Sequence, residues 1–156
     1  MNLTMLLMAF GAGAAIAAQA VVNGRLAAGL AGNTLSAALV SVCSGTLTLA
    51  LVSLARGGLP ASVALLPNQS PWTFAGGVLG AGFLFSTAFL APRMGLTNML
   101  VLIIAGQLMM SVTIDHFGLL QSLVRPVSLI RLLGVVVVLV GVMLTLLGER
   151  LVAALR

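Results

Sequence analysis

The sequence predicts an all-α integral membrane protein with five membrane-spanning helices. Of its 156 residues, 61% are hydrophobic and only 6% are charged, whereas about a quarter of a soluble domain is charged. Five long segments contain no charged residue, and a helix needs about 20 such residues to cross the hydrocarbon core of a bilayer. Because backbone polar groups must be hydrogen-bonded inside lipid, we expect these segments to be helices and not strands.

The five predicted spans form a single transmembrane domain over residues 1–156, and in order they cover approximately 3–22, 35–55, 72–91, 96–114 and 129–147. The first span is expected to remain in the protein, because no positive charge precedes it as in a cleaved signal peptide. Asn23-Gly24 after it is interpreted as a helix-ending turn. Residues 91–95 are expected to form a very tight hairpin. The last span begins before Arg131, whose long side chain can reach the membrane interface.

The positive charges suggest anchoring and orientation. The net charge of +5 comes from arginines alone, which stand singly near the ends of apolar runs, so headgroup contact fits better than nucleic-acid binding. Five crossings place three arginines on the face of the N-terminus and four on the other: Arg56, Arg125 and Arg131 against Arg25, Arg93, Arg150 and Arg156. This balance gives almost no preferred orientation. We therefore expect dual topology and an antiparallel homodimer of ten helices, an inverted-repeat arrangement. A single prevailing orientation is the alternative.

Small residues recur at helical spacing in two spans. Gly76 and Gly80 form a GxxxG pair, and Gly134 and Gly141 stand seven residues apart. Such residues let helix backbones approach closely in lipid. The pattern predicts close packing, either within one chain or between chains.

Polar side chains within the spans are candidates for a substrate pathway. On a helix, Thr97, Gln107, Ser111 and Asp115 fall within about an 80° arc, and Gln19 and Asn23 extend a second stripe along the first span. Unpaired amides are costly in hydrocarbon, so these stripes are expected to avoid lipid and line a pathway. Hydrogen bonds that only join helices are the alternative.

Three further residues are candidates for a gate or for coupling. Asp115 and His116 are interpreted first as a helix-end contact with the headgroups, with Gly118 as the cap. Proton coupling or gating is the alternative, since histidine titrates near neutrality. Arg93 is interpreted as an interfacial anchor, or alternatively as an anion-attracting group at a vestibule.

The absences narrow the function. Asp115 and Glu149 are the only acids, and both lie at span ends, so neutral, zwitterionic or anionic substrates are favoured over lipophilic cations. Cys43 is alone, which excludes a disulfide within the chain. No phosphate loop, set of metal ligands or dinucleotide fingerprint is present. We expect no enzyme activity, no cofactor, no metal and no nucleic-acid partner.

Several motifs together point to a family. They are Gln19 with Asn23, Ser41 with Gly45-Thr46, Pro71-Trp72, 76–80 (GGVLG), 91–95 (APRMG), 105–108 (AGQL), 114–118 (IDHFG) and 131–134 (RLLG). On these residues the chain resembles the small YdcZ-type inner-membrane proteins of the drug/metabolite transporter superfamily. Val42, where the family pattern has an aromatic residue, departs from it. The resemblance implies half of a ten-helix transporter that exports or exchanges small molecules across the cell's inner (plasma) membrane.

The leading hypothesis is therefore a secondary transporter of small metabolites or drugs, embedded in lipid and active as an antiparallel dual-topology homodimer. A dual-topology channel is one alternative. A non-transporting partner subunit of a heterodimeric transporter is another.

Overall fold

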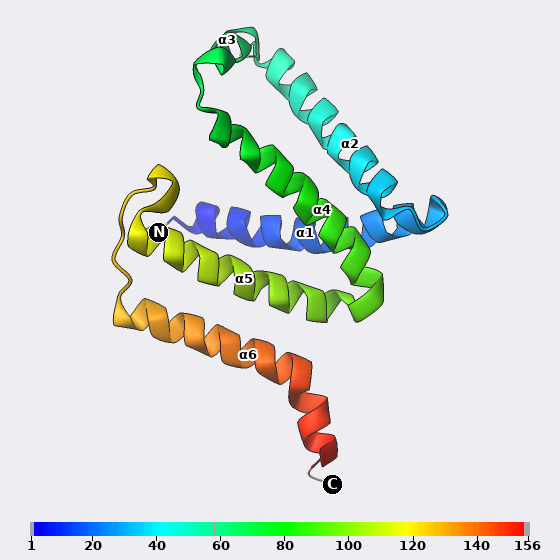
Figure 1. Ribbon diagram of the computed structural model, residues 1–156, viewed down its shortest axis with the longest axis vertical. Helices are drawn as coiled ribbons and strands as arrows, with labels where there is room; N and C mark the ends of the chain where they lie inside the picture. Colours follow the sequence, from blue (N-terminus) through cyan, green and yellow to red (C-terminus); the bar gives the residue numbers. More distant parts are fainter. Residues whose placement is uncertain (1, 58, 155–156) are drawn as a thin grey trace. The chain divides into compact units, whose positions relative to one another are not determined.

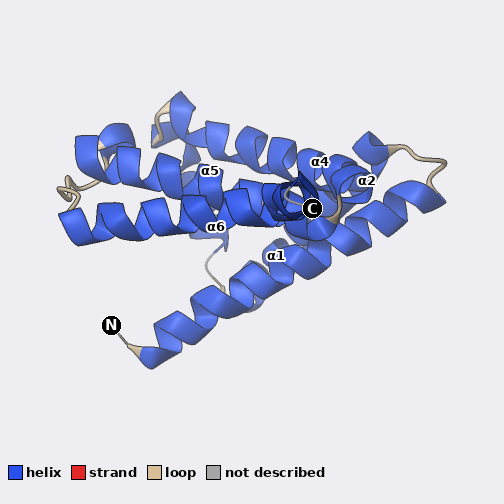
Figure 2. Ribbon diagram, turned by 90° about the horizontal axis from the view of Figure 1, so that it is seen from below, coloured by secondary structure: helices blue, strands red, loops and turns tan. Residues whose placement is uncertain are grey.

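The computed structural model of the protein describes residues 2–57 and 59–154, and most of that length is helical (Figure 1; Figure 2). Five segments are long and apolar enough to cross a membrane: α1 (Leu3–Gly29), α2 (Thr34–Ala55), Pro71–Met94, α5 (Leu96–Phe117) and Leu129–Gly148. They confirm the predicted number of spans. Of the charged residues, Arg156 and the side chains of Glu149 and Arg150 lie outside the described residues.

Short helices occupy the connections between the spans. The link from α2 to α4 (Ala75–Met94) contains α3 (Leu59–Ala64) and the 3-10 helices η1 (Leu66–Asn68) and η2 (Pro71–Phe74). A third 3-10 helix, η3 (Leu119–Gln121), lies between α5 and α6 (Leu129–Ala154). α6 starts two residues before Arg131, as the sequence predicts.

The predicted end of the first span is wrong. α1 continues through Asn23-Gly24-Arg25 to Gly29, and the chain turns at Ala31 and Gly32, where φ is 55° and 82°. An interior Asn or Gly costs a helix only about 0.5–1 kcal/mol, and packing against α2 and α4 holds this part of α1. The 27 residues of α1 correspond to a length of about 40 Å, so the helix exceeds the hydrocarbon thickness of about 30 Å.

The hairpin predicted over residues 91–95 is reduced to one residue. Pro92 and Arg93 belong to the last turn of α4, and Gly95 alone separates α4 from α5. Its φ of 83° lies in the left-handed region that favours glycine.

The chain divides into two compact units, residues 1–94 and 95–156. In the first unit α1, α2 and α4 contact one another pairwise. The buried apolar residues of these helices are all alanines: Ala20, Ala27, Ala37, Ala38 and Ala88. Side chains this small let helix backbones approach closely, which is how helices associate in lipid. The second unit packs α5 against α6, with η3 beside the end of α5.

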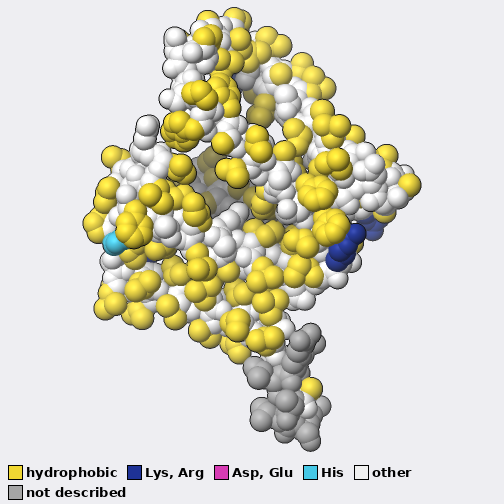
Figure 3. Space-filling view, viewed as in Figure 1, with side chains coloured by type: hydrophobic (Ala, Val, Ile, Leu, Met, Phe, Trp, Pro, Cys, Tyr) yellow, Lys and Arg dark blue, Asp and Glu magenta, His cyan; other side chains and the backbone are white. Residues whose placement is uncertain are grey.

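Large apolar side chains cover the outside of the helices. Hydrophobic side chains are spread over the face shown in Figure 3, and only 6–11% of the most apolar 18-residue stretch of each candidate span is buried. The four candidate packing glycines have open space beside them: a Cβ at Gly76, Gly80, Gly134 or Gly141 would meet no atom of the described residues within 4 Å. Within its own unit, each of these glycines therefore makes no close contact with a neighbouring helix.

Candidate functional site

Four of the five predicted pathway residues are exposed. Gln19 lies on α1, and Thr97, Gln107 and Ser111 lie along α5. The Ser111 hydroxyl donates to the carbonyl of Leu108 at 3.0 Å, so its hydrogen-bonding need is met by its own helix. α1 and α5 belong to different units. Neither Gln19 nor Gln107 has a hydrogen bond from its amide group to a described residue of its own unit.

Asn23, the fifth pathway candidate, is buried. Its side chain is only 3% exposed, and it lies on the face of α1 that also carries Ala20 and Ala27. Its amide nitrogen, Nδ2, has no hydrogen-bond partner among the described residues. An unsatisfied buried donor costs about 1–3 kcal/mol, so this amide is a candidate for contact with a molecule that the chain does not supply.

A hollow of about 330 Å³ lies where α1, α2 and α4 meet. We call it the Arg93 pocket, and its lining comprises Gly24, Ala27, Ala28, Gly32, Thr34, Ala88, Pro92 and Arg93. Ala27 is four residues from Asn23 and therefore on the same face of α1, one turn nearer the helix end. Thr87, which precedes Ala88, is also buried, and its hydroxyl donates to the carbonyl of Leu84 at 3.0 Å.

The guanidinium group of Arg93 is held by its own helix. One terminal nitrogen donates to the carbonyl of Phe89 at 2.6 Å, and the guanidinium carbon lies 3.5 Å from the centre of the Phe89 ring. That ring stacks on Phe85, with ring centres 5.8 Å apart. A cation over an aromatic face is stabilised by the ring electrons, so the positive charge is kept at the pocket.

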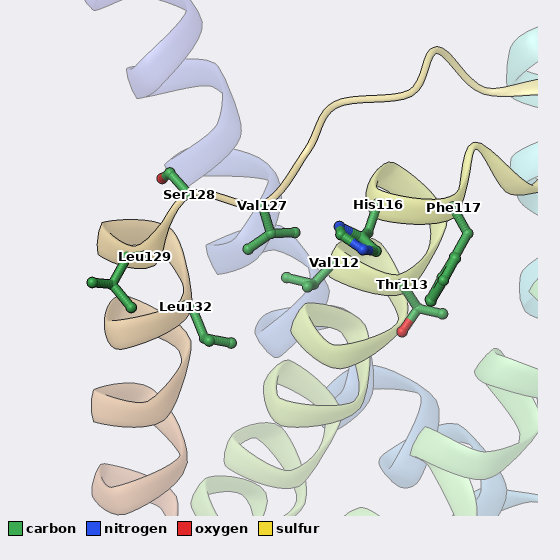
Figure 4. Close-up of a pocket in the computed structure, with 8 residues that line it drawn as sticks. All are labelled: Val112, Thr113, His116, Phe117, Val127, Ser128, Leu129 and Leu132. Atoms are coloured by element: carbon green, nitrogen blue, oxygen red, sulfur yellow. The ribbon is translucent and has the colours of Figure 1, made fainter.

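A second hollow, of about 480 Å³, lies in the unit of α5 and α6. We call it the His116 pocket (Figure 4), and its lining comprises Val112, Thr113, His116, Phe117, Val127, Ser128, Leu129 and Leu132. Val112 and Val127 lie between the two helices in the view of Figure 4. The imidazole of His116 meets the Phe117 ring edge-on, with ring centres 4.8 Å apart. Most of this lining is apolar.

Asp115 lies in the last turn of α5 and contacts both the loop after that helix and α6. Its backbone carbonyl accepts a hydrogen bond from the backbone N–H of Arg125 at 2.8 Å. Its carboxylate lies 3.8 Å from a guanidinium nitrogen of Arg131 on α6, and the two side chains are 37% and 51% exposed. An ion pair this exposed contributes about 0–1 kcal/mol. These contacts support the helix-end interpretation of Asp115.

Gly118 caps α5, as the sequence predicts. It adopts the left-handed conformation, with φ 61° and ψ 33°, and its N–H donates to the carbonyl of Ile114. A Cβ at this position would lie 2.6 Å from Cγ2 of Val124 and 3.3 Å from the carbonyl oxygen of Ser122. Both the left-handed backbone conformation and the nearby atoms of Ser122 and Val124 therefore favour glycine here.

We expect Gly118→Ala to lower the free energy of unfolding by about 1–3 kcal/mol, because it forces alanine into a strained conformation and a steric overlap. The thermal midpoint of the purified protein in detergent measures this. Gly106→Ala is the matched control, since Gly106 lies inside α5 with open space beside it and alanine favours a helix. Equal midpoints for Gly118→Ala and the wild type would show that the cap is not a constraint.

Two polar residues of the first unit were not predicted from the sequence. Thr34 borders the Arg93 pocket, and Thr87 is buried near it in α4. Both occur in sequence segments that have the pattern of an ordinary apolar helix. Their place at or near the pocket becomes visible only when α1 is packed against α2 and α4. The described residues contain no cluster of His, Cys, Asp or Glu able to hold a metal ion.

Comparison with known proteins gives one match. A family model described as "Putative inner membrane exporter, YdcZ" matches residues 4–144 of the chain. No match was found among curated proteins or among solved structures. The match runs nearly end to end and confirms the resemblance seen in the motifs.

Proposed function

Because the chain belongs to the YdcZ family of inner-membrane exporters, we propose that it is a secondary transporter of small molecules that works as an antiparallel homodimer. It is an inner-membrane protein with five helices able to span a membrane, and its family is one of exporters and not of enzymes. In the proposed assembly each chain is half of a ten-helix inverted repeat of the drug/metabolite transporter type. The substrate pathway runs between the two halves.

The observation that carries this proposal is the exposed amide of Gln107. This residue lies in the middle of α5, and the residues around it in the sequence are almost all apolar. No described residue of its own unit, 95–156, bonds to it. An amide facing hydrocarbon without a partner costs several kcal/mol. A second copy of the chain, with a water-filled pathway beside it, would supply the missing hydrogen bonds.

Two further features support pairing of inverted copies. The arginines divide three against four between the two faces, so the insertion machinery has little basis for choosing one orientation. In addition, Gly76 and Gly80 in the first unit, and Gly134 and Gly141 in the second, have open space beside them within their own unit. Glycines at such spacing are suited to close contact with another helix, and a second chain provides one.

In this proposal uncharged polar side chains line the pathway and bind the substrate, and no carboxylate of the protein takes part. Its residues are Gln19, Asn23, Thr97, Gln107 and Ser111. No acid occupies the middle of any span, so neutral, zwitterionic or anionic substrates are favoured over permanent cations. Rocking of one half against the other would expose the site to each side of the membrane in turn. The Asp115 and His116 side chains, at the end of α5, are the proposed gate.

Labelling a single cysteine from each side of the membrane tests the antiparallel arrangement. Cys43→Ser removes the only thiol, and a new cysteine is added after Arg156. We expect an impermeant maleimide to label this thiol in both intact cells and inside-out vesicles, because both orientations coexist.

The cysteine-free Cys43→Ser protein is the control for background labelling. A second variant, Arg56→Gln, leaves two arginines on the face of the N-terminus and four on the other face. It should therefore shift the ratio of labelling between the two sides of the membrane. Labelling from one face alone, in the variant with all seven arginines, would contradict the antiparallel homodimer.

A further inference from the structure

We propose that the Arg93 pocket is an oxyanion-binding site that receives the carboxylate or phosphate group of a small molecule. The inference rests on the proposed transport function, because the molecule that the pocket receives is then the transported substrate. It adds a substrate class to that function: molecules that carry one or more acidic oxygens.

The charge of the first unit favours an anion. Residues 1–94 contain three arginines, Arg25, Arg56 and Arg93, and no aspartate or glutamate. Arg93 therefore has no carboxylate partner within its unit. A guanidinium group without a counter-ion, in a pocket walled by apolar side chains, attracts anions and repels cations.

The geometry of Arg93 leaves donors free for a ligand. Of the five N–H groups of a guanidinium, one is directed to the Phe89 carbonyl. The structure gives the others no partner among the described residues. Because the Phe89 carbonyl and ring hold the group in place, less conformational entropy is lost when an oxyanion accepts from the remaining donors.

Further donors border the same pocket. Thr34, the first residue of α2, lines it, and the N–H groups of a first helical turn carry partial positive charge and lack partners within the helix. The Asn33 side chain satisfies one of them, the N–H of Ser36, at 3.0 Å. The N–H of Thr34 has no partner within the helix, and Thr34 is the α2 residue that an oxyanion in the pocket would meet.

Asn23 supplies the independent observation. Its Nδ2 is a buried donor without a partner among the described residues, and Asn23 precedes Ala27, which lines the pocket, by one helical turn on the same face of α1. Arg93 and Thr34 in the pocket, with Asn23 one turn away, thus offer N–H and O–H donors without any carboxylate. Its volume of about 330 Å³ lies at the small end of ligand sites, which suits a molecule of a few heavy atoms.

A lipid headgroup phosphate presents the same chemistry as a soluble carboxylate or phosphate, so the experiment has one arm for each. The full-length protein is purified in an uncharged maltoside detergent, and its thermal midpoint is measured with sodium acetate or inorganic phosphate against sodium chloride at equal ionic strength. In the other arm, phosphatidylglycerol is added to the same micelles. We expect either oxyanion source to raise the midpoint of the wild type.

Arg93→Gln should weaken this binding at least about tenfold, because it removes a charge-assisted hydrogen bond. Arg25→Gln is the matched control: it removes the same charge from an exposed position on α1 outside the pocket, and it should change the affinity less than about twofold. If Arg93→Gln does not fold, Arg93→Lys replaces it, with weaker binding expected because lysine lacks the planar fork.

Stabilisation by acetate or phosphate that depends on Arg93 supports the site with a soluble occupant. Stabilisation by phosphatidylglycerol alone, with the same dependence, supports the site with a headgroup as occupant. No stabilisation from either source, or equal losses in Arg93→Gln and Arg25→Gln, would overturn the proposal. Because the readout is binding and not flux, it stands apart from the test of the transport function.

Discussion

Replacing Asn23 with leucine is expected to make the protein more stable and, at the same time, at least about tenfold slower in transport. The Asn23 side chain is 3% exposed and its Nδ2 has no partner among the described residues, so the folded protein bears the cost of burying that donor. Leucine has the same branching at Cγ and no polar atom. The gain in the free energy of unfolding should be about 1–3 kcal/mol.

The expected loss of transport has a different origin. If Asn23 donates a hydrogen bond to the passing molecule, removing it leaves that contact unmade in the rate-limiting state. A tenfold lower rate corresponds to about 1.4 kcal/mol, which is the scale of one hydrogen bond. Opposite changes in stability and activity are the signature of a residue kept for function at the expense of folding.

Thermal midpoints in detergent and flux in liposomes measure the two effects. Thr87→Val is the matched control for stability, because Thr87 is 2% exposed and its hydroxyl is bonded to the Leu84 carbonyl; we expect this substitution to give no gain. A lower midpoint for Asn23→Leu would mean that the amide is paired in the native protein. Unchanged flux would exclude Asn23 from the pathway.

The spans could be predicted from the sequence because lipid imposes a simple condition on them. A helix that crosses the hydrocarbon needs about 20 predominantly apolar residues, and five segments of this chain are long and apolar enough to do so. The start of α6 before Arg131 and the cap at Gly118 were also predictable, since a long side chain can snorkel and a left-handed cap favours glycine. These are local rules that need no knowledge of neighbouring helices.

The end of α1 could not be predicted by such rules. Asn-Gly is a common turn sequence, yet here Asn23 is packed against neighbouring helices and the chain turns only at Ala31 and Gly32. The Arg93 pocket was equally hidden, because it forms only where α1, α2 and α4 come together. The sequence identified Arg93 and Asn23 separately. That both residues lie at or near one pocket depends on which helices pack together. The periodicity of residues within each helix does not predict which helices these are.

The strongest expected effect on α5 is that of Gln107→Leu, which should lower transport at least about tenfold while the dimer is retained. The Gln107 amide is exposed at mid-span and bonds to no described residue of its own unit. In the proposed dimer it faces the substrate, so leucine removes a contact to the moving molecule. Flux in liposomes gives the rate, and the mass of the detergent-solubilised protein gives the oligomeric state.

The alternative role for Gln107 predicts a different result. If its amide only joins helices across the interface, the loss of one interhelical hydrogen bond weakens dimerisation by about 0.6–2 kcal/mol, and flux falls only as far as the dimer dissociates. Thr48→Val, on α2, is the control, because the Thr48 hydroxyl already donates to the Ser44 carbonyl at 2.8 Å and its loss should leave both readouts unchanged. Normal flux in Gln107→Leu would contradict the proposed pathway, because transport would then not need the Gln107 amide.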